Sequence, residues 1–319
     1  MSMKVFVTRK IPSVGLNMLK DKGFDLIVSE KDAVLSKEEL LQELKTHQPE
    51  ALLCLLTDTI DAEVFDAAPI KICATYSVGF NHIDLKAAKE RGIIVTHTPG
   101  VLTDAVAEFT TTLIFALAKR VVEADKFARD GLYKGWEPEL LLGMELKGKT
   151  LGILGAGRIG TRVAQIAMAL GLKVLYSDIA QNQYLDKMGA VYEDKDTLLK
   201  RADIVSLHVP LLDSTRHFMS TKEFELMKDT ALLVNTSRGP VVDEEALVQA
   251  LKAGKIAGAA LDVFENEPQI HPELISMENV ILTPHIASAT QETRNKMSEM
   301  AAQSIIDFAE GKKPEHVVE

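Results

Sequence analysis

Three ionisable side chains with complementary chemistry each follow a short apolar run in the second half of the chain: Arg238, Glu267 and His285. A guanidinium presents two parallel N–H donors to a carboxylate. An imidazole titrates near neutral pH, so it can give a proton to a carbonyl oxygen. Together the three side chains predict a site that orients an acid and protonates its carbonyl group. Taken singly, Arg238 could cap a helix, Glu267 could be a loop residue and His285 could be structural.

A glycine-rich turn lies between an expected strand, Thr150–Leu154, and an expected helix, Thr161–Leu170, and reads G-A-G-R-I-G. Gly155 permits a tight turn, Gly157 lets a pyrophosphate approach the backbone, and Gly160 lets helix and strand pack closely. The N-terminus of the helix adds unpaired N–H groups and the positive end of a dipole. This context favours a dinucleotide-binding loop over three ordinary turn glycines.

The strand after this loop ends in Asp178, which lies 18 residues beyond Gly160. An acid at about this spacing accepts hydrogen bonds from the ribose hydroxyl groups of NAD. Its charge would repel a 2′-phosphate, and residues 179–184 contain no Arg or Lys to compensate. The sequence therefore predicts NAD as the cofactor, with NADH preferred over NADPH. The alternative is a solvated aspartate at the end of a strand.

Short β-branched runs alternate with amphipathic helical stretches along the whole chain. The expected strands of the first third are Lys4–Thr8, Asp25–Val28, Ala51–Leu56, Lys71–Thr75 and Ile93–Thr96. Those of the second series are Thr150–Leu154, Lys173–Tyr176, Ile204–Leu207, Ala231–Asn235, Ala257–Leu261 and Val280–Leu282. Such alternation predicts right-handed crossovers and parallel sheets with helices on both faces. Since ligands of these sheets bind beyond the carboxyl ends of the strands, Arg238, Glu267 and His285 can converge there.

The predicted fold class is α/β, with two doubly wound parallel-sheet domains. The boundary falls between Thr96 and Thr150, where a strongly apolar helix is expected over Thr103–Arg120. A last helix over Thr290–Glu310 has no sheet of its own, so we expect it to return to the first domain. The predicted domains are residues 1–98 with 287–319, and residues 99–286.

Composition and charge narrow the classes of partner. Hydrophobic residues make up 46% and charged residues 26%, values typical of a folded globular protein. The 36 basic and 46 acidic residues give a net charge of −10 without any basic run, which disfavours a nucleic-acid partner. No apolar stretch has the roughly 20 residues of a membrane span. The N-terminal residues lack the apolar core of a signal peptide, so no membrane association and a cytoplasmic location are expected.

Two cysteines and six further histidines are assigned no chemistry. Cys54 and Cys73 lie in apolar runs without C-x-x-C spacing, and we expect them to be buried as small hydrophobic residues. The histidines show no metal-ligand spacing, so no metal site is predicted: they are His47, His82, His97, His217, His271 and His316.

Several segments together resemble the D-2-hydroxyacid dehydrogenase family over nearly the whole chain. They are SVGFNHID (77–84), TPGVLTDAVAE (98–108), GILGAGRIG (152–160), HVP (208–210), NTSRGPVVDEEAL (235–247), ALDVFENEP (260–268) and TPHIAS (283–288). WEPELLLG (136–143) is similar to the glyoxylate/hydroxypyruvate reductase branch. The resemblance implies a Rossmann NAD-binding domain, a flavodoxin-like substrate domain and an active-site cleft between them.

The resemblance also implies roles for individual residues. Arg238 would orient the substrate, Glu267 would support the histidine, and His285 would donate the proton. Backbone N–H groups of Val78 and Gly79 would bind the substrate carboxylate. The implied cofactor contacts are Thr103, Arg158, Ile159, Asp178, Pro210, Thr215, Thr236, Asp262 and Ala287. Members of the family usually dimerise through the nucleotide domain, so a homodimer is expected; whether Trp136 reaches the neighbouring subunit's active site is left open.

The expected activity is reduction of glyoxylate or hydroxypyruvate by NADH to the D-2-hydroxy acid. One alternative is a non-catalytic NAD-binding regulator of the corepressor type, against which the complete set of Arg238, Glu267 and His285 argues. Another is a family enzyme for 3-phosphoglycerate, a bulkier 2-oxo acid or phosphite. Residues 77–84 contain no Arg or Lys, which disfavours a phosphorylated substrate because a second anion needs its own partner.

Overall fold

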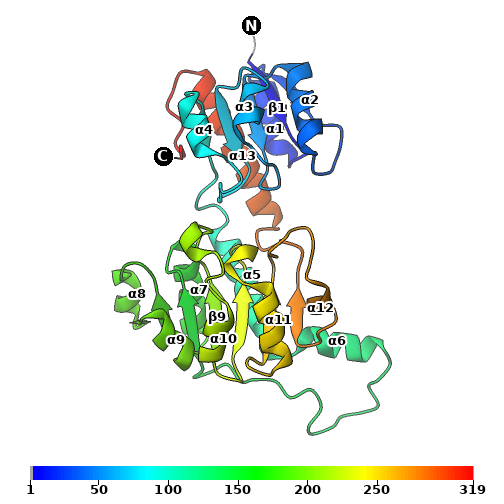
Figure 1. Cartoon of the computed structure of the whole chain (residues 1–319), viewed down its shortest axis with the longest axis vertical. Coiled ribbons are helices and arrows are strands. Elements are labelled where there is room, and N and C mark those ends of the chain that lie inside the picture. Colours follow the sequence, from blue (N-terminus) through cyan, green and yellow to red (C-terminus); the bar gives the residue numbers. More distant parts are fainter. Residues whose placement is uncertain (1–2, 319) are drawn as a thin grey trace. The chain divides into compact units, whose positions relative to one another are not determined.

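The computed structural model describes residues 3–318, which divide into two compact units. The first unit consists of the described residues up to Leu102 together with those from Ala289 onward, and the second is Thr103–Ser288 (Figure 1). The chain therefore leaves the first unit once and returns to it with its last helix. Within residues 3–318, no helix combines the length and the apolar character that a membrane span requires.

The described part of the first unit is built on a five-stranded parallel sheet in the order β2-β1-β3-β4-β5. Its strands are β1 (Lys4–Val7), β2 (Asp25–Val28), β3 (Ala51–Cys54), β4 (Ile72–Thr75) and β5 (Ile94–Thr96). Its helices are α1 (Ser13–Asp21), α2 (Lys37–His47), α3 (Ala62–Asp66), α4 (Leu85–Glu90) and α13 (Gln291–Ala309). The strand order is that of flavodoxin-like folds, which confirms the predicted fold class for this unit.

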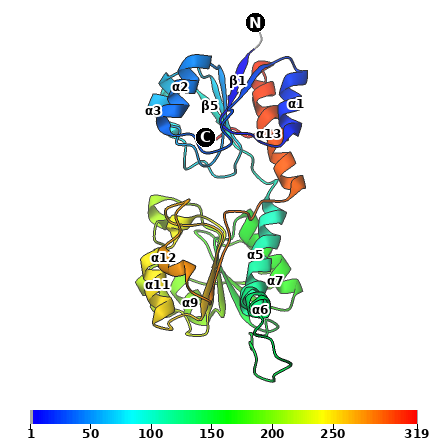
Figure 2. The ribbon, with the colours of Figure 1, turned by 90° about the vertical axis from the view of Figure 1, so that its right-hand side faces the viewer.

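Alternate residues of these strands face opposite layers of helices. Phe6 packs with residues of α2, α3 and α4, whereas Val5 packs with residues of α1 and α13. Figure 2 shows α2 and α3 on one face of the sheet and α1 and α13 on the other. Cys54 and Cys73 are free and fully buried in the first of these layers, as expected. Because both faces of the sheet are covered, its strands read as continuous apolar runs in the sequence.

Polar side chains cap the N-termini of four helices among the described residues of this unit, and α2 and α13 show how. The Ser36 hydroxyl accepts the N–H of Glu39 at 3.2 Å, and the Glu39 carboxylate accepts the N–H of Ser36 at 2.7 Å. These two bonds form a capping box that begins α2. Thr290 caps α13, which then packs along α1, where the Ser298 hydroxyl donates to the carbonyl oxygen of Pro12 at 2.7 Å.

The second unit holds a seven-stranded parallel sheet in the order β12-β11-β10-β9-β6-β7-β8. Its strands are β6 (Thr150–Leu154), β7 (Lys173–Ser177), β8 (Val191–Tyr192), β9 (Ile204–Leu207), β10 (Leu232–Asn235), β11 (Gly258–Leu261) and β12 (Val280–Leu282). Its helices are α5 (Thr103–Ala118), α6 (Val121–Arg129), α7 (Arg158–Ala169), α8 (Gln183–Met188), α9 (Lys195–Arg201), α10 (Thr221–Leu226), α11 (Glu244–Lys252) and α12 (Pro272–Ile275), with 3₁₀ turns at Asp213–Thr215 and Gly239–Val241. Counted from β6, the sheet has the Rossmann order 3-2-1-4-5-6 with β12 added at one edge. This order confirms the predicted Rossmann fold of the unit.

Two features of this unit differ from the prediction. Strand β8 is additional, and its two residues are too few for an alternating pattern to show in the sequence. Helix α7 begins at Arg158 rather than at Thr161, because the Thr161 N–H already bonds to the carbonyl oxygen of Gly157 at 2.9 Å. Gly157 is therefore the N-cap, and Gly160 lies in the first turn of the helix.

The units divide at 102/103 and 288/289, where the sequence places the domain boundaries at 98/99 and 286/287. Val101 and Leu102 pack into the core of the first unit, so the chain leaves that unit later than predicted. At the second boundary, the Ala287 N–H donates to the carboxylate of Asp262 at 2.8 Å. This bond keeps the residues after β12 in the second unit.

Candidate active site

The glycine loop joins β6 to α7 and packs against the segment after β9. Gly155 has a φ of +97°, and a Cβ there would lie 2.7 Å from the carbonyl carbon of His208, so only glycine fits. A Cβ on Gly160 would lie 2.0 Å from the Gly155 carbonyl oxygen. At Gly157, by contrast, no atom lies within 4 Å of a Cβ position. Open space beside the first turn of a 12-residue helix suits a pyrophosphate, so this loop fits a dinucleotide.

Asp178 follows β7 directly and is bonded to the glycine loop. Its Oδ2 accepts the N–H of Ala156 at 2.6 Å, and its Oδ1 accepts the N–H of Ile179 at 2.6 Å. Each oxygen keeps a second lone pair, so the carboxylate can still accept hydrogen bonds from ribose hydroxyl groups. Asn182, which no motif marks, donates to the Ala156 carbonyl oxygen at 2.9 Å and braces the loop from its other side. Its only signal in the sequence is its place as the cap of α8.

The remaining residues predicted to contact the cofactor lie at the carboxyl edge of this sheet or at the start of α5. They are Thr103, Arg158, Ile159, Pro210, Thr215, Thr236, Asp262 and Ala287. The Thr215 hydroxyl donates to the Pro210 carbonyl oxygen at 2.6 Å and closes the turn after β9. Thr236 is buried, with its hydroxyl oxygen 2.7 Å from that of Thr110. Burial lowers the pKa of His208 to about 3, so its imidazole, whose Nε2 lies 2.9 Å from the Ser206 hydroxyl, is uncharged at neutral pH.

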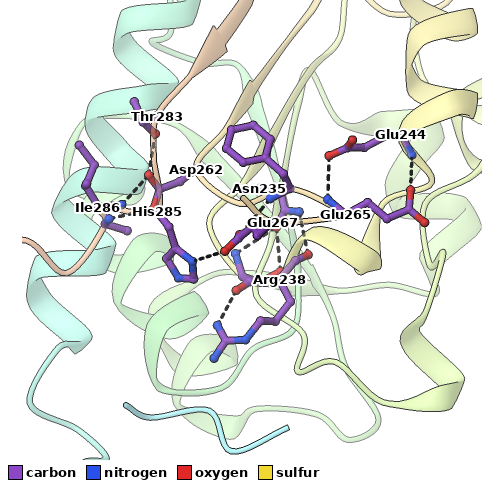
Figure 3. Close-up of polar contacts among 12 residues, drawn as sticks. Asn235, Arg238, Glu244, Asp262, Glu265, Glu267, Thr283, His285 and Ile286 are labelled. Atoms are coloured by element: carbon purple, nitrogen blue, oxygen red, sulfur yellow. Dashed lines mark hydrogen bonds and ion pairs between the residues drawn. The ribbon is translucent and has the colours of Figure 1, made fainter. Parts of the chain in front are cut away.

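Glu267 and His285 form a hydrogen-bonded pair (Figure 3). The Nδ1 atom of His285 lies 2.9 Å from Glu267 Oε2, while Glu267 Oε1 accepts the N–H of Phe264 at 3.0 Å. Burial raises the pKa of Glu267, but His285, the Phe264 N–H and the Arg238 guanidinium together bring it below its usual value. Glu267 is thus ionised at neutral pH and accepts a hydrogen bond from the Nδ1–H of His285. The Nε2 atom of His285 is left to exchange a proton with a ligand.

Asp262 holds the segment that carries His285. Its Oδ1 accepts the Thr283 hydroxyl at 2.6 Å and the Ile286 N–H at 2.9 Å, and its Oδ2 accepts the Ala287 N–H at 2.8 Å. Burial raises the pKa of Asp262, and these hydrogen bonds oppose that shift. His285 has a φ of +55°, which is uncommon outside glycine, and the bonds on both sides of it support that conformation. The carboxylate predicted to contact the cofactor is therefore engaged in positioning the histidine.

Arg238 lies on the turn after β10, which a buried asparagine braces. The Asn235 side chain donates to the Arg238 carbonyl oxygen at 3.0 Å and accepts the Ser237 N–H at 3.0 Å. The Arg238 Nη1 donates to the Ser237 carbonyl oxygen at 2.7 Å. Burial lowers the pKa of Arg238, and the charge of Glu267 opposes that shift. A Cβ on Gly239 would lie 1.8 Å from a carbonyl oxygen of the loop after β11, so glycine lets this turn touch the loop of Glu267.

The loop that carries Glu267 is also fastened to the start of α11. The Glu244 carboxylate accepts the N–H of Glu265 at 2.8 Å, and the Glu265 carboxylate accepts the N–H of Glu244 at 3.2 Å (Figure 3). The Nε2 atom of His217 lies 2.5 Å from the same Glu265 carboxylate. These contacts join segments distant in the sequence, and no motif reveals them.

The structure brings Arg238, Glu267 and His285 together within the second unit. Val78 and Gly79, the predicted donors to the substrate carboxylate, lie in the first unit on the turn between β4 and α4. In the part of the chain that the structure describes, no group of three or more His, Cys, Asp or Glu residues is arranged to hold a metal ion.

Comparison with known proteins identifies the family. The family model for the NAD binding domain of D-isomer specific 2-hydroxyacid dehydrogenases matches residues 111–287. A glyoxylate reductase of Thermofilum pendens is 54% identical, over 99% of this chain and 94% of its own. The structure of a Thermus thermophilus protein has a TM-score of 0.93 at 44% identity, covering 99% of this chain and 100% of that one. The NADPH-dependent glyoxylate/hydroxypyruvate reductase of Sinorhizobium meliloti, in complex with NADP and malonate, has a TM-score of 0.87 at 30% identity, covering 100% and 97%.

The family model covers most of the second unit, and the Thermofilum relative extends the match to the first. The folds of both units and the grouping of Arg238, Glu267 and His285 agree with that match. The chain belongs to the D-isomer specific 2-hydroxyacid dehydrogenases, and it is an oxidoreductase that interconverts 2-oxo and 2-hydroxy acids with NAD or NADP.

Proposed function

We propose that this enzyme reduces glyoxylate or hydroxypyruvate to the D-2-hydroxy acid with NADH, and that His285 is the proton donor. The observation that carries the proposal is the Glu267–His285 pair, 2.9 Å apart, on the same sheet edge as Arg238 and the glycine loop. An acid–base pair beside a carboxylate-binding cation suits a 2-oxo acid. The names of the Thermofilum and Sinorhizobium proteins support a small substrate.

When bound, NADH supplies a hydride to the carbonyl carbon of the substrate. His285 donates its Nε2 proton to the carbonyl oxygen, so the product gains one hydride on carbon and one proton on oxygen. Glu267, kept ionised by its lowered pKa, stabilises the imidazolium before the transfer and holds its orientation. Arg238 binds the carboxylate and the neighbouring oxygen through its paired N–H groups. The backbone N–H groups of Val78 and Gly79, in the proposed substrate-binding unit, also bind the carboxylate.

The second unit is proposed to hold the cofactor with its pyrophosphate at the first turn of α7 and its ribose at Asp178. A carboxylate at the ribose favours NADH, whereas the Sinorhizobium relative is NADPH-dependent. We expect a higher kcat/KM with NADH than with NADPH. Asp178→Ala is expected to narrow that preference by about tenfold, since one charged hydrogen-bond acceptor is lost. An equal or reversed preference in the unmutated enzyme would refute this assignment.

We also propose a homodimer formed through the second unit. α6 and the segment after it carry large apolar side chains that this chain leaves exposed: Val121, Val122, Tyr133, Trp136 and Leu142. Figure 1 shows this segment extending away from the rest of the second unit. Light scattering should give twice the chain mass of 35.0 kDa. Trp136, the sole tryptophan and 82% exposed in the single chain, should show blue-shifted fluorescence in the dimer.

The proposed reaction is tested by turnover of the purified protein, followed at the nicotinamide absorbance band. NADH and NADPH are each offered with glyoxylate, hydroxypyruvate, pyruvate, phenylpyruvate and phosphohydroxypyruvate. Rapid oxidation of NADH with the first two acids supports the proposal. Turnover of only a bulky or phosphorylated acid would overturn the substrate. NADH binding without turnover of any acid would overturn the catalytic proposal in favour of an NAD-binding regulator.

A further inference from the structure

The turn at residues 77–80 presents three successive backbone N–H groups that donate to no residue in the described part of the chain. They belong to Val78, Gly79 and Phe80. Successive amides on a turn form a concave site for an anion. A peptide group is planar and trans, so its C=O and N–H point in opposite directions. Whatever holds a carbonyl oxygen of this turn therefore directs the N–H of the next residue.

All three relevant carbonyl oxygens are bonded from the protein interior. The Ser77 oxygen accepts the N–H of Thr98 at 2.9 Å, which directs the amide of Val78. The Val78 oxygen lies 2.8 Å from Nδ1 of His97, which directs the amide of Gly79. The Gly79 oxygen accepts the Ser77 hydroxyl at 2.6 Å, which directs the amide of the following residue. Because a carbonyl oxygen only accepts, His97 must carry its proton on Nδ1.

The Ser77 hydroxyl is the end of a chain of hydrogen bonds that starts at His82. Its oxygen lies 2.7 Å from the Thr75 hydroxyl, which lies 3.0 Å from Nε2 of His82. Each hydroxyl has one proton. Ser77 gives its proton to the Gly79 oxygen, so Thr75 must donate to Ser77 and His82 must donate to Thr75. His82 therefore carries its proton on Nε2, with Cys54 Sγ 4.0 Å from the same nitrogen.

The surrounding residues hold the hydrogen bonds of His97 and His82 in place. Thr75 is fully buried and Ser77 is 2% exposed, so water does not compete for their hydroxyl groups. The His97 ring packs edge-on against Phe80, with 5.6 Å between the ring centroids. The backbone N–H of His97 donates to the carbonyl oxygen of His316 at 3.1 Å, which ties it to the C-terminal segment.

We propose that His97 and His82 are positioning residues that direct the amides of Gly79 and Phe80 toward the substrate carboxylate. The N–H of Phe80 is then a third donor beside those of Val78 and Gly79. The inference rests on the proposed function, because the anion is the carboxylate of the 2-oxo acid. The two histidines act through carbonyl groups, so their loss weakens substrate binding and leaves hydride transfer and cofactor binding unchanged.

Substitution of histidine by asparagine or glutamine tests the two ring nitrogens separately. The Asn side-chain nitrogen occupies the place of histidine Nδ1, and the Gln nitrogen occupies the place of Nε2. His97→Asn and His82→Gln are therefore expected to keep the KM for glyoxylate near that of the unmutated enzyme. His97→Gln and His82→Asn are expected to raise it about tenfold, the effect of one hydrogen bond to a charged group. kcat and the Kd for NADH should stay nearly constant in all four variants, and the melting temperature should fall slightly in His97→Gln and His82→Asn, which each lose one hydrogen bond.

A second readout does not need turnover. Oxamate reproduces the carboxylate and carbonyl of a 2-oxo acid, and it is titrated into the NADH-loaded, ¹⁵N-labelled enzyme and its four variants. We expect the amide signals of Val78, Gly79 and Phe80 to shift, and the oxamate Kd to follow the same pairing as KM. Equal effects within each Asn/Gln pair would overturn the positioning roles.

The two proposals fail in distinguishable ways. Absence of turnover together with paired oxamate affinities and shifted amides would refute the proposed reaction and keep the positioning roles. Normal turnover without amide shifts would refute the positioning roles and keep the reaction. Absence of both would refute both.

Discussion

Two turns in this enzyme are proposed to offer backbone N–H groups to an anion, and they orient those groups by different means. In the glycine loop of the second unit, the donors are the first amides of α7, and the helix itself sets their direction. On the 77–80 turn of the first unit, no helix follows until Leu85. Direct or relayed bonds from Thr98, His97 and His82 to carbonyl oxygens set the direction instead.

The difference predicts how each turn is damaged. Amides at a helix N-terminus should lose the anion when a side chain fills the space in front of them. Amides on a turn without a helix should lose it when the hydrogen bonds to their carbonyl groups are removed. The glycine loop requires glycine at fixed spacing, which can be recognised in the sequence. The 77–80 turn depends on Ser, Thr and His side chains that form no sequence motif.

The largest loss of activity is expected at Arg238, because its guanidinium carries a full charge, whereas each backbone amide of the two turns carries only a partial charge. Arg238→Ala is expected to lower kcat/KM for glyoxylate by about 10³-fold, with the Kd for NADH unchanged. Arg238→Lys keeps the charge but not the paired donors, so its kcat/KM should lie between those of Arg238→Ala and the unmutated enzyme. Steady-state kinetics measure both variants. A loss of less than about tenfold in Arg238→Ala would remove its assigned role.

Glu267→Gln leaves both turns intact and removes only the charge beside His285. We expect kcat for reduction to fall by about 10²-fold, the scale of a general acid–base contribution. Because the folded-state pKa of Glu267 lies below its usual 4.5, the carboxylate contributes stability that is complete above that value. This contribution is lost as the pH falls through the lowered pKa. The variant should therefore show a flatter acid limb in melting temperature against pH, and an unchanged limb would refute the pairing.

Gly157 and Gly155 are expected to have different roles. Gly157 leaves room for the ligand, whereas Gly155 is required by the fold. Gly157→Ala fills open space, so it should raise the Kd for NADH about tenfold while the melting temperature stays the same. Gly155→Ala forces a side chain onto a positive φ against a backbone carbonyl, so it should cost about 1–3 kcal/mol of stability. Calorimetry of NADH binding and thermal unfolding distinguish the two. Matching losses of stability would contradict the comparison.

Ser36→Ala gives the smallest expected effect, because it removes a helix cap far from both turns in the sequence. The loss of the capping box should cost about 1 kcal/mol of stability. The KM for glyoxylate and the Kd for NADH should not change. A changed KM would show that substrate binding responds to general weakening of the first unit, which would undermine the histidine variants as specific tests.

Both sheets could be predicted because their strands are covered on two faces and so appear as short continuous apolar runs. Strand β8 escaped prediction because two residues carry no periodicity. The sequence predicts the start of α7 too late because glycines usually mark a turn, whereas Gly160 lies inside the helix.

The grouping of Arg238, Glu267 and His285 could be predicted because each follows the carboxyl end of a parallel strand. The bonds of Asp262 to the His285 segment could not, because they depend on the path of the backbone after β12. The sequence assigns no chemistry to His97 and His82, because they show no metal-ligand spacing. Their partners are a carbonyl oxygen and a hydroxyl on a neighbouring strand end, and neither contact has a sequence pattern.

Single-turnover reduction of glyoxylate by NADH-loaded enzyme tests most directly whether His285 donates the proton. The unmutated protein is compared with His285→Asn, in which the Asn nitrogen can keep the bond to Glu267 while Nε2 is lost. We expect the variant to have the same Kd for NADH, the same melting temperature and a rate at least about 10²-fold lower. A rate within about tenfold of the unmutated enzyme would contradict the assignment of His285 as the proton donor.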